Sequence, residues 1–117
     1  MENEPLWKMS ATAVVKALRQ SDLHPAEVVE SAIIRIEDID GEINALPIRC
    51  FERALNQAES LRPSDDTKYL AGLPIAVKDY NDVGGVRTTY GSAIFADYIP
   101  ESSDATVQKL SHVAPFP

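Results

Sequence analysis

Lys78 is the residue of this chain with the clearest potential for chemistry. It follows a compact apolar run, residues 73–77, that predicts an interior strand. In open α/β folds, functional side chains gather at the carboxyl ends of strands, beside a crevice. A lysine held there among apolar residues is desolvated, which disfavours the ammonium form and lets the neutral amine accept a proton from a serine hydroxyl. The alternative is a solvent-exposed strand end at which Lys78 pairs loosely with Asp79.

Other residue types that can do chemistry have weaker support. Ser102 or Ser103 with Asp104 and His112 would supply a Ser-His-Asp set, but they crowd into one short segment, and Asp104 is better placed as a helix cap. Cys50 opens a predicted helix, and no histidine stands at an informative distance from it. A single cysteine more commonly acts as a small buried hydrophobe. Two isolated histidines predict no metal site.

The glycine pair of DVGGV, Gly84 and Gly85, predicts a tight turn. It is not a phosphate loop, because both the GxGxxG spacing and a following Lys-Ser/Thr are missing. Arg87, just beyond it, is either a cation that faces a substrate or a structural arginine, and the structural role is favoured. No cofactor is therefore predicted.

The bulk composition excludes several classes of protein. The 117 residues are 44% hydrophobic and 25% charged, which is typical of one globular domain or part of one. A net charge of −7 argues against a nucleic-acid partner and against an anionic membrane surface. No apolar run is long enough to span a bilayer, and acidic residues stand where a signal peptide would carry a basic cluster. We expect a cytoplasmic protein, without an internal disulfide because there is one cysteine.

Hydrophobic periodicity predicts helices in the first half of the chain and a change of structure after it. Helices are expected at residues 10–20 with Ser10 as N-cap, at 25–41 with Gly41 at the end, and at 50–61. A short extended connector is expected at 43–48 and a polar loop at 62–69. After the strand at 73–77, Asp104 is expected to cap a last helix. The predicted class is α/β, with N-terminal helices followed by the first strands of a sheet.

Four segments closely resemble the amidase signature family. They are SATAVVKALRQSDLHPAEVVESAIIRIEDIDGEINAL, AGLPIAVKD, DVGGVRTTYGS and SDATVQKL, in the order that the family has them. The resemblance covers residues 10–110 of a partial amidase domain spanning 1–117, and residues 111–117, SHVAPFP, diverge from it. It implies a mixed sheet flanked by helices and hydrolysis of small-molecule amides by a Ser, cis-Ser, Lys triad, with no cofactor or metal. The family's catalytic lysine falls on Lys78.

The same resemblance implies that this chain lacks the partners of Lys78. The two catalytic serines of the family lie in a downstream segment of the GGSSGG kind, and none of Ser92, Ser102, Ser103 and Ser111 has that glycine setting. We therefore expect an N-terminal portion of an amidase that is inactive alone. One alternative is a relative of the A component of a tRNA-dependent amidotransferase. Another is a non-catalytic interaction module that self-associates through its uncompleted sheet.

Overall fold

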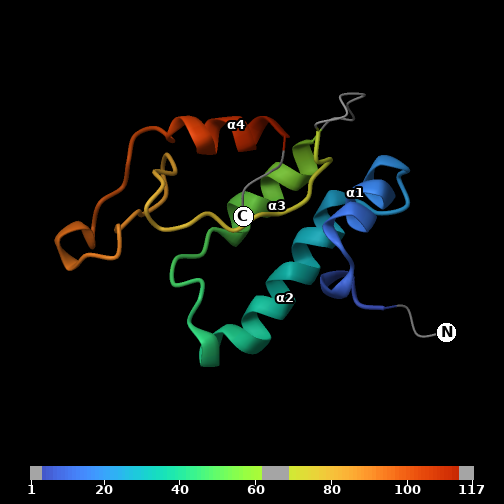
Figure 1. The fold of residues 1–117 in the computed structure, drawn as a ribbon, viewed down its shortest axis with the longest axis horizontal. Helices are drawn as coiled ribbons and strands as arrows, with labels where there is room; N and C mark the ends of the chain where they lie inside the picture. The colour runs from blue at the N-terminus through green and yellow to red at the C-terminus, as the bar shows by residue number, and fades with distance from the viewer. Residues whose placement is uncertain (1–3, 62–68, 114–117) are drawn as a thin grey trace.

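The computed structural model describes residues 4–61 and 69–113 (Figure 1). In chain order they form a short 3₁₀-helix η1 (Leu6–Lys8), helices α1 (Ala11–Arg19), α2 (Pro25–Ile43) and α3 (Phe51–Ser60), a second 3₁₀-helix η2 (Ala93–Phe95) and helix α4 (Ala105–Val113). Four predicted helices are thus confirmed, while the polar loop and the divergent tail fall mostly outside the described residues. None of the described helices is long and apolar enough to cross a membrane.

The helix starts follow from local capping chemistry. The Ser10 hydroxyl accepts a hydrogen bond from the backbone N–H of Ala13 at 3.2 Å, as predicted for α1. At α2 the ring of His24 accepts from the N–H of Ala26 at 3.1 Å, and the Glu27 carboxylate accepts from the N–H of His24 at 2.7 Å. This reciprocal arrangement satisfies backbone donors that the first helical turn leaves unpaired.

The predicted end of α2 at Gly41 is wrong. Gly41 lies inside the helix, which continues to Ile43 and ends at Asn44 in the left-handed conformation, with φ 54°. Asparagine tolerates that conformation, and the buried carboxylate of Asp40 accepts hydrogen bonds from the N–H groups of Ala45 and Leu46 beyond it. The helix therefore ends where its polar groups find side-chain and backbone partners.

Among the described residues, the core consists of three small apolar clusters. Val14, Leu18 and Val28 join α1 to α2, and Ala26, Val29, Ala54 and Ala58 join α2 to α3. The third cluster is separate from the helical pair: Val83 and Val107 are buried, and Ile75, Val77, Val86 and Leu110 pack against them. It fixes α4 against the segment that carries Lys78, which runs beneath α4 in Figure 1.

The predicted strand at 73–77, and with it the predicted first strands of a sheet, is not seen in the described residues. Residues 73–77 belong to no ladder, since none of the described residues hydrogen-bonds to the backbone of 74–77. A strand is defined by pairing, and an apolar β-prone sequence cannot supply its own partner. Ile75 and Val77 pack into the third cluster while Ala76 between them is exposed, so the segment is covered on one face and is not the interior strand that was predicted.

The molecule is flat and extended for its length. Its principal extents are 49 × 34 × 20 Å and its radius of gyration is 14.9 Å, whereas a compact domain of this length has a radius of about 13 Å. Much of the chain after α3 is irregular, and this irregular part lines the cavity described next.

Candidate functional site

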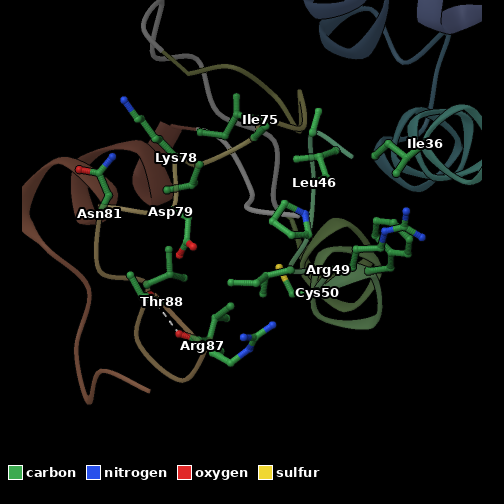
Figure 2. Close-up of a pocket in the computed structure, with 18 of the residues that line it drawn as sticks. Ile36, Leu46, Arg49, Cys50, Ile75, Lys78, Asp79, Asn81, Arg87 and Thr88 are labelled. Carbon is green, nitrogen blue, oxygen red and sulfur yellow. Dashed lines mark hydrogen bonds between the residues drawn. The ribbon is translucent and has the colours of Figure 1, made fainter. Parts of the chain in front are cut away.

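A cavity of about 580 Å³ lies between the connector that follows α2 and the segment that carries Lys78 (Figure 2). Its size is in the range of small-molecule pockets. The lining comes from α2 (Ala32, Ile36), from residues 45–51 and from residues 74–88, and most of it is apolar. The polar side chains in the lining are Arg49, Cys50, Lys78, Asp79, Asn81, Arg87 and Thr88.

One wall of the cavity is held in place by Asp40. Its carboxylate accepts hydrogen bonds from the N–H of Ala45 at 2.7 Å, from the N–H of Leu46 at 3.2 Å and from the guanidinium of Arg49 at 3.2 Å. The hydrogen bond from Ala45, aided by Leu46 and Arg49, lowers the pKa of Asp40 even though burial opposes the shift. This carboxylate therefore ties the connector back onto the end of α2 and shapes the cavity.

Lys78 lies at the edge of the cavity and is exposed, which differs from the predicted desolvated site. Its ammonium lies 4.7 Å from the centroid of the Tyr80 ring, a cation–π contact. In Figure 2 its side chain extends away from Arg49 and Cys50 on the opposite wall, toward the side where Asn81 lies. In this arrangement the ammonium remains hydrated.

Asp79 is not the partner of Lys78. Its carboxylate accepts hydrogen bonds from the backbone N–H of Thr89, at 2.8 Å, and from the Thr89 hydroxyl. Figure 2 shows the carboxylate turned toward Thr88, on the cavity side. The ion pairs recorded between described residues are Arg35–Asp38 and Arg49–Asp40, so the predicted loose pairing of Lys78 with Asp79 is wrong.

The predicted tight turn at Gly84 and Gly85 is confirmed. Gly85 has φ 78°, and a Cβ on Gly84 would lie 3.1 Å from the Cα of Ser102. The carbonyl of Gly84 accepts from the Arg53 guanidinium at 2.6 Å, and its N–H donates to the Ser103 hydroxyl at 2.8 Å. The turn thus links α3 to the residues just before α4, and it lies between Val83 and Val86, which line the cavity.

Arg87 makes a structural contact and also lines the cavity. Its guanidinium donates to the backbone carbonyl of Ala96 at 3.1 Å, which is a structural contact. It also lines the cavity and points toward the wall that carries Cys50 in Figure 2. Arg87 therefore adds a positive charge to a lining that also carries Arg49, Lys78 and Asp79.

An exposed aromatic group lies beyond the cavity. The rings of Tyr90, Phe95 and Tyr98 contact one another with centroids 5.1 to 6.1 Å apart. The Tyr90 hydroxyl donates to the Asp82 carboxylate, and this hydrogen bond raises the pKa of Tyr90. Tyr90 has φ 53° and is followed by Gly91 at 68°, so the backbone turns sharply here.

The less favoured catalytic sets have members that are engaged in local contacts, and the side chain of His112 lies outside the part of the chain that the structure describes. The Ser103 hydroxyl accepts from Gly84, and the Asp104 carboxylate accepts from the N–H of Val107 at 2.9 Å as the predicted cap of α4. Cys50 precedes α3, and burial raises the pKa of its thiol, which disfavours the nucleophilic thiolate. Groups of three or more metal-ligating residues do not occur in the part of the chain that the structure describes.

Sequence reasoning missed the contacts of Asp40 with the connector and the contact between Asp79 and Thr89. The helical periodicity assigns Asp40 to no site, because an acidic residue on an amphipathic helix ordinarily faces water. The available signal is the left-handed preference of Asn44, which moves the end of the helix and places Asp40 beside unpaired N–H groups.

Comparison with known proteins identifies the family. The family model described as Amidase matches residues 27–113. The A component of glutamyl-tRNA(Gln) amidotransferase from Alkaliphilus metalliredigens is 34% identical over 107 residues, 88% of this chain and 22% of that protein. Its counterpart from Koribacter versatilis is 40% identical over 98 residues, 80% of this chain and 20% of that protein. The chain therefore spans about a fifth of the length of these curated relatives.

Solved structures agree with this assignment. A chain from a vestigial protein complex, described as revealing the evolutionary origins of an s-triazine catabolic enzyme, superimposes with a TM-score of 0.80 at 30% identity and covers 92% of this chain. Its inhibitor-bound form gives a TM-score of 0.81, and in both this chain covers 25% of the other. The described helices and irregular segments thus have the arrangement found in part of an amidase fold. The chain belongs to the amidase signature family, and it corresponds to a portion of a full-length member.

Proposed function

We propose that this chain is the lysine-bearing portion of an amide hydrolase, with Lys78 as the catalytic lysine of a Ser, cis-Ser, Lys mechanism. The observation that carries the proposal is the position of Lys78, directly after the apolar segment 73–77 and at the edge of the cavity. Family membership supports it, since the matched residues 27–113 include Lys78. The proposed substrate is a small-molecule amide, and residues 1–117 form a partial amidase domain whose last residues, 111–117, diverge.

We propose further that the chain is inactive alone. A lysine in this mechanism accepts and returns protons through hydroxyl groups, and three of the four serines between Lys78 and Val113 make local contacts through their hydroxyls. Ser92 caps η2, the Ser103 hydroxyl binds Gly84, and the Ser111 hydroxyl donates to the carbonyl of Val107 at 2.8 Å. Ser102 is exposed on an irregular segment, without the glycine-rich setting that would hold a nucleophile.

The first test measures ammonia release from simple carboxamides by the purified chain, for which we expect no turnover above background. The second replaces the corresponding segment of the Koribacter versatilis relative with residues 10–110 and measures the amidotransferase activity of the chimera. In that chimera Lys78→Ala should lower kcat by roughly a thousandfold or more, as removal of a member of a catalytic set does. Lys16→Ala is the matched control, because Lys16 is exposed on α1, and it should leave kcat unchanged.

Two outcomes would contradict this proposal. Turnover by the purified chain that disappears in Lys78→Ala would show that it is not inactive alone. A chimera that retains full kcat after Lys78→Ala would remove Lys78 from the chemistry. If both chimeras are silent, circular dichroism at 222 nm reports whether the transplanted helices have folded.

The main alternative is a relative of the A component of an amidotransferase, supported by the names of the relatives. Such a protein works on amides together with other proteins. A protein partner is therefore compatible with the amide hydrolase proposed above and with this alternative. A second candidate function is a non-catalytic interaction module that self-associates through its uncompleted sheet, for which the backbone of residues 74–77, to which none of the described residues hydrogen-bonds, would supply the edge. Cytoplasmic location stays a prediction from composition and from the single cysteine.

A further inference from the structure

The side chain of Lys78 is exposed, but its backbone is held on both sides. Before it, Val77 packs into the third apolar cluster. After it, the half-buried carboxylate of Asp79 accepts hydrogen bonds from the backbone N–H of Thr89, at 2.8 Å, and from the Thr89 hydroxyl. Apolar packing on one side and a two-point polar contact on the other therefore fix the backbone of the lysine between them.

The contact between Asp79 and Thr89 uses both oxygens of the carboxylate. Each oxygen accepts from a different donor of Thr89, and hydrogen bonds to an ionised acceptor are stronger than neutral ones. The Thr89 hydroxyl also accepts from the N–H of Gly91 at 3.3 Å, which directs its own proton to Asp79. Asp79 lies in the turn that the N–H of Asn81 closes on the carbonyl of Lys78, at 3.0 Å. The turn that begins at the lysine is thereby anchored to Thr89.

We propose that Asp79 is a positioning residue for Lys78: through Thr89 it fixes the backbone from which the lysine reaches the reacting atoms. This inference rests on the catalytic role proposed for Lys78 and deepens it by naming the residue that sets the position of the lysine. Figure 2 shows the two side chains leaving adjacent residues in opposite directions, Asp79 toward Thr88 and Lys78 away from it. Asp79 therefore acts through the backbone. Such an effect matters because a misplacement of about 1 Å can lower the rate about a hundredfold.

A second carboxylate contact in the same loop provides a matched control. The Tyr90 hydroxyl donates to the carboxylate of Asp82, so two adjacent residues each give one hydroxyl to an aspartate. Asp79 adjoins Lys78, whereas Asp82 follows the turn. Thr89→Val and Tyr90→Phe each remove one hydrogen bond from a hydroxyl to a carboxylate. A contact that only stabilised the loop would give the two variants the same effect on activity.

Kinetics of the chimera used for Lys78 test the positioning role. Thr89→Val should lower kcat roughly tenfold to a hundredfold and leave KM within about twofold, because the placement of the lysine changes and substrate binding does not. Thr89→Ser keeps the hydroxyl and should restore most of kcat, and Tyr90→Phe should leave kcat unchanged. Asp79→Asn supplies one acceptor and a competing donor, so it should lower kcat at least as far. Adding Thr89→Val to Asp79→Asn should lower kcat no further, since both remove the same contact.

Backbone dynamics of the 117-residue chain test the same contact without turnover, and they decide the matter if the chimeras are silent. The NMR order parameter of the Lys78 amide should be about 0.85 in the unmodified chain, should fall toward about 0.6 in Thr89→Val, and should not change in Tyr90→Phe. Equal effects of the Thr89 and Tyr90 variants in either experiment would overturn the positioning role and leave the catalytic role of Lys78 standing. Full kcat after Lys78→Ala would overturn both roles.

Discussion

Replacing glycine by alanine should change the free energy of unfolding in opposite directions at Gly72 and at Gly41. Gly72 precedes the segment that leads to Lys78 and has φ 108°, in a region that L side chains rarely adopt. A Cβ there would lie 2.7 Å from the Cβ and 2.9 Å from the Cγ of Pro25, in the first turn of α2, and 3.1 Å from the Cδ1 of Leu61. The Pro25 ring cannot rotate away, so the backbone must move.

The magnitude follows from three contributions. A residue held in a sparsely populated backbone region costs about 1–3 kcal/mol, and overpacking costs about another 1–3 kcal/mol. Alanine also restricts the unfolded chain, which offsets about 0.4–1 kcal/mol. Gly72→Ala should therefore lower the free energy of unfolding by roughly 1–5 kcal/mol, a large share of the stability of so small a domain.

Gly41→Ala is the matched control. Gly41 lies inside α2, and a Cβ there would meet nothing within 4 Å. Alanine in an exposed helix interior should raise the free energy of unfolding by about 0.5–1 kcal/mol. Urea unfolding followed by circular dichroism at 222 nm measures both variants. A loss below about 0.5 kcal/mol for Gly72→Ala, or losses of the same size at the two sites, would refute the reasoning from φ and from Pro25.

Two further predictions concern pH. The pKa of Asp40 is lower in the folded state, so the hydrogen bonds of its carboxylate stabilise the fold above the unfolded pKa of about 3.9, and this stabilisation is lost as pH falls through the folded pKa. Asp40→Asn should therefore lower the urea midpoint at pH 7, and the difference in urea midpoint from the unmodified chain should shrink toward pH 3. A difference that stays constant with pH would contradict the stabilising role of the Asp40 carboxylate. The hydrogen bond to Asp82 raises the pKa of Tyr90, so it stabilises the fold fully below the unfolded pKa of about 10, and this stabilisation is lost as pH rises through the folded pKa. Absorbance at 295 nm should show one tyrosine that ionises at higher pH than the others, and Tyr90→Phe should remove this step. A titration that Tyr90→Phe leaves unchanged would assign the step to another tyrosine.

Local chemistry was sufficient to predict the helices. Ser10, Pro25 and Asp104 stand where capping or the first turn requires them, and each start depends on atoms within three residues. The end of α2 was the exception, because its choice between Gly41 and Asn44 depends on Asp40 contacts that reach five and six residues along the chain.

The sequence by itself determined the family and the helices, because these follow from residue types at short spacing. The tertiary structure decided what surrounds them. It left residues 74–77 without a ladder among the described residues, gave Asp79 to Thr89 instead of Lys78, and placed the Lys78 ammonium in solvent over Tyr80. The physical reason is that pairing and desolvation are supplied by segments distant in the chain, and the sequence around a residue does not specify which of them will lie against it.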